Sequence, residues 1–115
     1  MREAVIQQHI RLALSGAGAV MFRNNVGATH TPDGRIIRYG VCNPGGSDLL
    51  GWTPMLITAD MVGQAVAVFT ACEVKTANGR ATEDQMNFIR AVQRAGGFAG
   101  IARSPEEAVA IIQGF

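Results

Sequence analysis

An acid and a base lie two residues apart at the end of the most strand-like segment of the sequence. Glu73 and Lys75 follow a run that is dense in valine and alanine, and side chains at positions i and i+2 of a strand project from the same face. A carboxylate and an ammonium group are therefore expected side by side where an apolar strand ends. Taken alone, such a pair is more often a surface ion pair than a catalytic one, so its meaning depends on other residues.

A second acid, Asp48, follows the turn formed by residues 43–46, Asn-Pro-Gly-Gly. If the short strand expected at Asp48 pairs with the strand of Glu73, the two carboxylates can share one cation. Two carboxylates, a backbone carbonyl such as that of Val74 and several waters form a ligand set suited to Mg²⁺ or Mn²⁺. Such a cation lowers the pKa of a bound water and neutralises charge on a phosphate, while Lys75 can orient the attacking water or stabilise developing charge. Capping of the turn is the structural alternative for Asp48.

A third acid, Glu3, stands in the N-terminal segment. It lies seven residues before Ile10 and therefore nearly shares the direction of the apolar stripe of the predicted helix. A carboxylate at the end of that stripe points toward the edge of the core, where it could reach a cation directly or through water. The alternative is that Glu3 only stabilises the first helical turn through the helix dipole.

Together and in this order, these residues resemble the virus-type replication-repair nuclease domain of the PD-(D/E)xK superfamily, over nearly the whole chain. Residues 45–49, Gly-Gly-Ser-Asp-Leu, are similar to the family's glycine-rich segment that ends in a metal-binding Asp, and residues 73–75 are similar to its E-x-K signature. Glu3 stands in the N-terminal helix where the family has an acid, and Gln85 matches the family's glutamine in the next helix. Gln85 is also the N3 residue of a capping box, so two roles compete for one amide.

The resemblance implies a divalent-cation-dependent phosphodiesterase that acts on DNA. Stand-alone domains of this length resemble phage-encoded endonucleases that act as homodimers on branched DNA, such as four-way junctions. One alternative is a DNA-binding or assembly domain that keeps the fold without cleavage, and the presence of both acids and the lysine argues against it. Another is a metal enzyme for a small phosphorylated substrate, which would call for an enclosing pocket rather than arginine-bearing loops.

The basic residues are nine arginines and one lysine in a chain of net charge +1. Arginine suits bidentate contact with phosphate, and four arginines are candidate DNA contacts: Arg80, in the loop after Lys75, together with Arg23, Arg35 and Arg38. A solvated surface charge is the alternative for each of them. The two histidines, at positions 9 and 30, have no metal-ligand spacing and are interpreted as non-catalytic.

Several elements must position these residues. Helices are predicted over residues 2–15, from Thr82 to about Arg94, and from Pro105 behind a Ser104 cap. Strands are predicted over residues 20–26, 47–51, 65–75 and 98–102. Residues 27–40 are predicted as a polar loop with a turn at 32–34 and a possible short strand at 35–38, and residues 55–58 as a strand or an irregular crossing. This order predicts one α/β domain over residues 1–115, with a central mixed sheet flanked by helices, and the resemblance makes it a restriction-endonuclease-like (PD-(D/E)xK) core.

The composition bounds the class of protein. Hydrophobic residues make up 48% of the 115, which excludes a disordered chain, and no apolar run approaches the ~20 residues of a membrane span. The two cysteines and the absence of a signal peptide predict a reduced, cytoplasmic protein, as a phage or prophage product would be inside a bacterial host. Five large apolar residues without an evident place in a small core predict a homodimer interface: Trp52, Met55, Ile57, Met61 and Val62.

Overall fold

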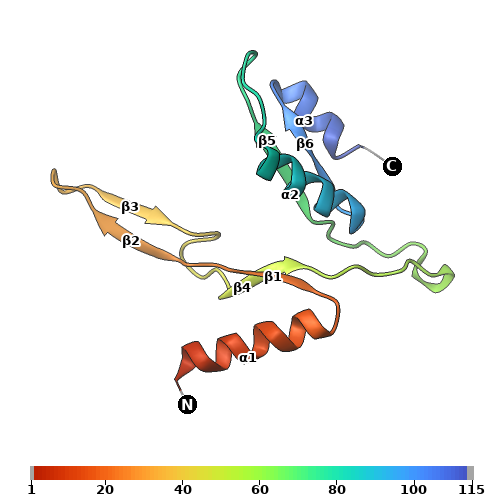
Figure 1. The fold of residues 1–115 in the computed structure, drawn as a ribbon, viewed down its shortest axis with the longest axis horizontal. Coiled ribbons are helices and arrows are strands. Elements are labelled where there is room, and N and C mark those ends of the chain that lie inside the picture. The colour runs from red at the N-terminus through yellow and green to blue at the C-terminus, as the bar shows by residue number, and fades with distance from the viewer. Residues whose placement is uncertain (1, 114–115) are drawn as a thin grey trace. The chain divides into compact units, whose positions relative to one another are not determined.

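The computed structural model describes residues 2–113, and the chain divides into two compact units, Met1–Thr53 and Pro54–Phe115. Figure 1 labels the helices and strands of both units. The strands form three two-stranded sheets, β1–β4, β2–β3 and β5–β6. The predicted mixture of helices and strands is therefore present. The predicted single central sheet is not found among residues 2–113 and stays a prediction, because it would have to join strands of both units.

The first unit opens with α1 (Glu3–Gly16), as predicted for residues 2–15. The helix ends where Ala17 donates its N–H to the Ala13 carbonyl and Gly18 adopts a φ of 101°, a left-handed conformation that stops a helix. Residues of α1 contact β1 (Val20–Arg23). Ala19, in the connection between them, is buried. The apolar stripe of α1 is only half covered, with Ile6 42% and Ile10 47% exposed.

Residues 27–40 form a β-hairpin. The prediction of a polar loop is therefore wrong for residues 27–30, whereas the possible short strand at 35–38 is confirmed by a strand at Ile36–Tyr39. Strand β2 (Gly27–His30) pairs antiparallel with β3 (Ile36–Tyr39), with Gly27 opposite Tyr39. The predicted turn is confirmed, because Gly34 has a φ of 87° and donates its N–H to the Thr31 carbonyl. Strand β2 has the sequence Gly-Ala-Thr-His, which lacks apolar alternation, so its strand conformation comes from pairing with β3 rather than from its own propensity.

Strands β1 and β4 (Leu49–Trp52) pair antiparallel in a register that places Arg23 opposite Leu49. Both are shorter than the predicted 20–26 and 47–51. Asp48 therefore lies directly before its strand and not within it, because the ladder ends at the Arg23–Leu49 pair. Packing between the rings of Phe22 and Trp52, with centroids 5.4 Å apart, supports the pair of strands.

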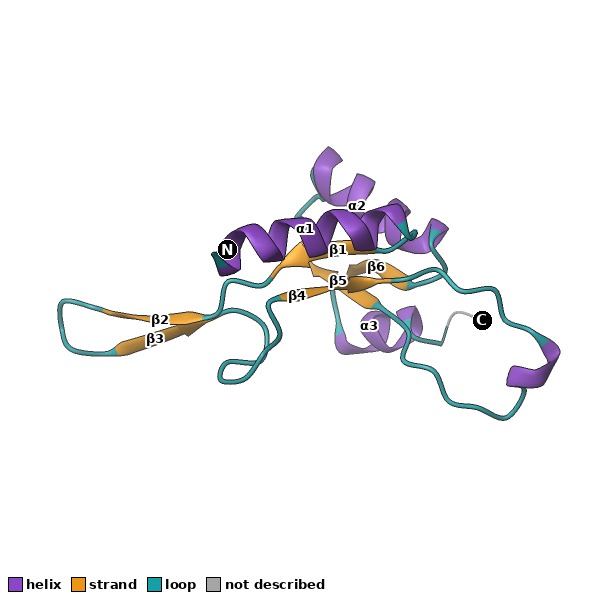
Figure 2. Ribbon diagram, turned by 90° about the horizontal axis from the view of Figure 1, so that it is seen from below, coloured by secondary structure: helices purple, strands orange, loops and turns teal. Residues whose placement is uncertain are grey.

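The second unit is built on a parallel pair, β5 (Thr70–Val74) and β6 (Phe98–Ala102). Parallel strands need a long crossover, which α2 (Glu83–Arg94) provides. Figure 2 shows α2 and α3 (Pro105–Ile111) on opposite faces of this pair. The prediction for β6 is confirmed, whereas β5 is shorter than the predicted 65–75 because its pairing partner β6 has only five residues.

Helix caps and a small apolar core define the rest of the second unit. The predicted caps are confirmed: Thr82 and Gln85 form a capping box, and Ser104 caps α3 with Pro105 in its first turn. The core residues are Ile89 and Val92 of α2, which are 5% and 1% exposed, together with Ala99 and Ala102 of β6. No helix among residues 2–113 combines the length and apolar character needed to cross a membrane.

Candidate functional site

Asp48 occupies the point where the β1–β4 ladder ends. Its backbone carbonyl accepts a hydrogen bond of 2.8 Å from the Asn24 N–H, which extends the pairing by one residue. The Asp48 residue is exposed, and within residues 2–113 its carboxylate takes part in no hydrogen bond or ion pair. Both carboxylate oxygens are therefore available to a ligand, so the turn-capping alternative has no hydrogen bond to support it.

The side-chain amide of Asn24 fixes the loop that carries Asp48. Its Nδ2 donates to the carbonyls of Val41 at 2.9 Å and Ser47 at 3.1 Å, and its Oδ1 accepts from the Val41 N–H at 2.8 Å. One side chain thus connects β1 to both ends of residues 41–47. Backbone N–H and carbonyl groups outside a ladder need hydrogen-bond partners. The Asn24 side chain provides partners for three such groups of this loop.

Two glycines are required by the closeness of this packing. A Cβ at Gly46 would overlap the Val41 carbonyl and come within 2.9 Å of Asn24 Nδ2. Gly40 has a φ of 95°, and a Cβ there would lie 2.7 Å from the Asn25 carbonyl oxygen. The loop can therefore approach Asn24 only because these positions lack a side chain.

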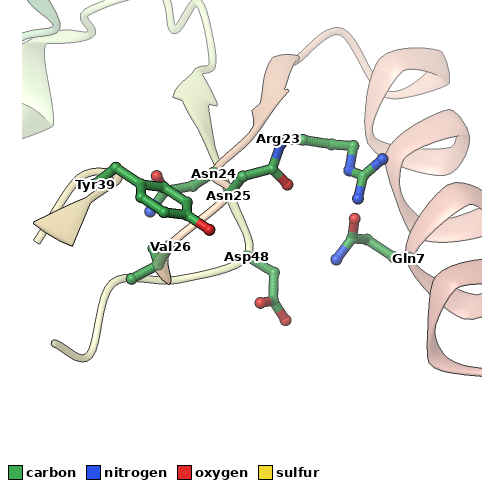
Figure 3. A pocket seen from close by; sticks show the side chains of 7 residues that line it. All are labelled: Gln7, Arg23, Asn24, Asn25, Val26, Tyr39 and Asp48. Carbon is green, nitrogen blue, oxygen red and sulfur yellow. The ribbon is translucent and has the colours of Figure 1, made fainter. Parts of the chain in front are cut away.

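A polar cavity of about 540 Å³ surrounds the Asp48 side chain (Figure 3). In this view Arg23 and Gln7 converge on one side, Tyr39 lies on the other, and Asp48 projects between them. Its full lining is Gln7, Arg23, Asn24, Asn25, Val26, Tyr39 and Asp48. Glu3 is one helical turn before Gln7, so both project from the same face of α1.

Glu73 and Lys75 lie together at the end of β5. Lys75 Nζ is 3.6 Å from Glu73 Oε2, with the two side chains 18% and 32% exposed. Val74 points the other way and is 75% exposed. Strand alternation therefore places the acid and the base on one face, as predicted from their spacing, while their catalytic role stays a prediction.

The loop after Lys75 is held by residues that follow β6. The Lys75 N–H donates to the Ala102 carbonyl at 3.1 Å, which continues the parallel ladder one residue beyond β5. Arg103 donates from its guanidinium to the Gly79 carbonyl at 2.8 Å. A Cβ at Gly79 would lie only 3.5 Å from Lys75 Cβ, so the loop returns against Lys75. Arg80 is the next residue and is exposed.

Gln85 is part of a capping box, which is the structural role given above as the alternative to a catalytic one. Its Oε1 accepts from the Thr82 N–H at 2.9 Å, and its own N–H donates to Thr82 Oγ1 at 3.1 Å. This capping box uses the amide oxygen of Gln85 and leaves the Nε2 hydrogens for another partner. A catalytic role of Gln85 is therefore limited to donation and stays a prediction.

The four candidate arginines differ in their surroundings. Arg23 lines the cavity of Asp48. Arg35 forms an ion pair of 2.9 Å with Asp33 at the hairpin tip, and the hydrogen bond from Thr31, with a further one from Arg35, holds the pKa of Asp33 below its usual range. A phosphate would have to compete with Asp33 for Arg35. Arg38 is exposed on β3, opposite Ala28.

The donor atoms at these positions fit a hard divalent cation. Asp48 and Glu73 offer carboxylate oxygens, the type of ligand that Mg²⁺ and Mn²⁺ prefer. Asp48 belongs to the first unit and Glu73 to the second. Across residues 2–113 no three His, Cys, Asp or Glu side chains are grouped as a metal cluster.

Three residues near Asp48 were not singled out by sequence reasoning: Gln7, Asn24 and Tyr39. The only local signals are the spacing of Gln7 four residues after Glu3, and the position of Asn24 directly after a strand. Neither signal identifies a partner. The hydrogen bonds of Asn24 reach residues 17 and 23 positions away, and such distant partners are decided by the fold.

Comparison with known protein families identifies a domain that spans most of the chain. The model of the VRR-NUC domain matches residues 23–106, which is most of the chain. The matched range contains Asp48, Glu73, Lys75 and Gln85, whereas Glu3 precedes it. No curated protein and no solved structure matches the chain.

The Asn24 hydrogen bonds predict a measurable loss of stability. Asn24→Ala should lower the free energy of unfolding by about 1–3 kcal/mol, because it leaves two backbone carbonyls and one backbone N–H without this partner. Asn24→Asp should lie between this variant and the natural protein, since a carboxylate keeps the acceptor for Val41 but loses both donors. Urea denaturation measures all three proteins.

The matched control is Asn87→Ala. Asn87 is exposed on α2, and its side chain accepts one surface hydrogen bond from Arg90. Its loss should change the free energy of unfolding by less than about 0.5 kcal/mol. If Asn24→Ala is as stable as Asn87→Ala, the Asn24 side chain does not hold the loop.

Proposed function

Because the chain belongs to the VRR-NUC family, a family of PD-(D/E)xK-type nucleases, we propose that it is a divalent-metal-dependent endonuclease that hydrolyses DNA phosphodiester bonds. The observation that carries this proposal is the ion pair of Glu73 and Lys75 at the end of β5, inside the matched range. A strand end that presents a partly buried acid and base on one face is the arrangement that phosphodiester hydrolysis beside a cation needs.

In this proposal Asp48 and Glu73 hold one Mg²⁺ or Mn²⁺ ion, with the Val74 carbonyl and waters as further ligands. Glu3 contributes directly or through a water from α1. The free carboxylate of Asp48 supports this assignment, and so does Glu73, whose side chain accepts no hydrogen bond within residues 2–113 and pairs there with Lys75. When bound, the cation lowers the pKa of a coordinated water and offsets phosphate charge.

Lys75 holds a positive charge beside the reacting phosphate. Its side chain is only 18% exposed, and its backbone is fixed by the bond to Ala102, so its ammonium group is restrained before substrate binds. A preorganised donor of this kind stabilises charge that develops in the transition state. Gln85, through its Nε2 hydrogens, serves to orient the water or the phosphate from the start of α2.

DNA is held by arginines on both units. Arg80 follows the loop that packs on Lys75, Arg23 lines the Asp48 cavity, and Arg38 projects from β3. Arg35 joins them at the hairpin tip only if phosphate displaces Asp33. The substrate is branched DNA such as a four-way junction, supported by the resemblance to stand-alone phage enzymes. In this proposal, the selectivity for such DNA comes from this domain and a second copy of it.

The second copy is proposed to cover an apolar segment after β4. Residues 54–68 contain one short 3₁₀ helix, Ala59–Met61, and the interval 55–58 is irregular. Met55, Ile57 and Val62 are 61%, 70% and 83% exposed, and Leu56 is 85% exposed. A symmetric dimer buries such a patch against its copy and presents two equivalent sites to a symmetric junction. Trp52 is half-buried and packs on Phe22.

The metal ligands give the first test of the function. Asp48→Asn and Glu73→Gln should each abolish cleavage of a labelled four-way junction in Mg²⁺ or Mn²⁺, because each removes a charged ligand of a hard cation. Gel analysis of the products measures cleavage, and circular dichroism checks the fold. The matched control is Glu106→Gln, in the first turn of α3, which should cleave normally.

Two results would contradict this assignment. Retention of the natural rate by either ligand variant at saturating metal would show that the residue is not a ligand. DNA binding by the natural protein without cleavage, across a panel of flap, nicked, duplex and junction DNAs with both metals, would show a non-catalytic DNA-binding domain.

Lys75 is expected to act on the rate and not on binding. Lys75→Ala should lower the single-turnover cleavage rate by about 10²-fold, the effect of removing one preorganised donor, with DNA affinity nearly unchanged. Rates and dissociation constants are measured on the same junction. If Lys75→Ala binds the junction poorly but cleaves it at the natural rate once bound, Lys75 serves only to bind phosphate.

The dimer is tested by mass in solution. Light scattering at micromolar concentration should give twice the 12.2 kDa of one chain, and Leu56→Glu should reduce that mass by charging the proposed interface. Val109→Glu, at a 49% exposed position of α3, is the control and should leave the mass unchanged. If the natural protein has the mass of one chain, the proposed dimer is wrong, and two equivalent sites are not presented to a symmetric junction.

A further inference from the structure

The cavity around Asp48 contains opposite charges that do not neutralise each other. Arg23 and Asp48 both line it, yet within residues 2–113 they form no ion pair, and the Arg23 side chain makes no hydrogen bond there. Some other arginines have partners, such as Arg35 with Asp33 and Arg103 with Gly79, whereas the side chains of Arg38 and Arg80 have none among residues 2–113. Arg23 is therefore a cation kept available next to an available carboxylate.

The rest of the lining is polar, and the cavity is large enough for a nucleotide. Six of the seven lining residues are polar, Val26 being the exception, and the volume of about 540 Å³ lies in the range of small-ligand sites. Gln7 adds an amide on the side of Arg23 (Figure 3). A planar guanidinium with a neighbouring amide donor suits a phosphodiester.

Tyr39 provides an aromatic wall on the other side of the cavity. Its ring lies over Gly27, where any Cβ would overlap the ring, and its carbonyl is held by Asn43 Nδ2 at 3.0 Å. The residue is 49% exposed, so one part of the ring is fixed and another is open. An exposed and restrained tyrosine is suited to stacking on a nucleobase.

We propose that this cavity is the subsite for the nucleotide next to the cleaved phosphodiester, with Arg23 and Gln7 binding its phosphate and Tyr39 stacking on its base. The position of the subsite beside the scissile bond rests on the proposed function, through Asp48. The occupancy of the cavity by a nucleotide rests on the lining residues alone.

The phosphate contact is tested by the salt dependence of DNA binding in a Glu73→Gln background, which leaves every residue of the first unit unchanged. Arg23→Ala should weaken junction binding roughly tenfold, as expected for one charge-assisted contact, and reduce the salt slope by about 0.7–0.9. Gln7→Ala should weaken binding by a smaller factor. The controls are Arg90→Ala and Gln8→Ala, whose side chains are engaged by Asn87 and Arg11.

The base contact is tested with 2-aminopurine placed in turn at each nucleotide beside the branch point. One position should show quenched fluorescence on binding, and Tyr39→Ala should remove the quenching and weaken binding roughly tenfold. Tyr39→Phe keeps the ring and should keep both. Because Tyr39→Phe is a conservative change, it separates loss of stacking from loss of the fold.

The outcomes distinguish this subsite from the proposed function. If Arg23→Ala behaves as Arg90→Ala does, or if quenching persists in Tyr39→Ala, the subsite is overturned even when the natural protein cleaves DNA. If the natural protein binds without cleaving and both effects are present, the subsite stands as a nucleotide-binding site and the nuclease proposal fails.

Discussion

Where β1 ends, the side-chain amide of Asn24 takes over the pairing that the strand no longer provides. The side chain accepts from the Val41 N–H and donates to the carbonyls of Val41 and Ser47. The backbone N–H of Asn24 donates to the Asp48 carbonyl. Backbone groups that leave a ladder need new partners. In the first unit one residue supplies four of these hydrogen bonds, and the place of Asp48 follows from them.

In the second unit, other residues provide hydrogen-bond partners for the backbone beyond the end of a strand. The backbone of Lys75 adds one bond to the parallel ladder through Ala102, and Arg103 binds the carbonyl of Gly79 in the loop that follows. The Arg103 N–H in turn donates to Glu107 Oε1 at 2.6 Å, at the start of α3. The end of β5 is therefore held from β6 and α3, and Glu73 and Lys75 are presented from a supported strand end.

Charge is distributed in a way that suits a phosphate substrate. Arginines at the hairpin tip and after β6 have partners within the chain, whereas Arg23 is left available in the cavity of Asp48. A carboxylate and a guanidinium that stay apart in one cavity can bind a cation and an anion at the same time. A phosphodiester with a divalent cation is such a combination, and an ion pair between the two side chains would have prevented it.

The sequence by itself determined the features that depend on local spacing. The caps of α2 and α3 could be predicted because Thr82 and Ser104 interact with residues three positions away. The common face of Glu73 and Lys75 follows from strand alternation. The sharing of one cation by Asp48 and Glu73 was predicted on the condition that their strands pair, and it stays a proposal.

Only the tertiary structure decided the β2–β3 hairpin, the short length of β5 and the cavity of Gln7, Arg23 and Tyr39. Strand β2 has no apolar alternation and becomes a strand through its partner, and β5 ends where β6 has no more residues to pair. The role of Asn24 rests on partners 17 and 23 residues away. Such contacts leave no periodic or capping signal along the chain, because they exist only once distant backbone groups have been brought within hydrogen-bonding distance.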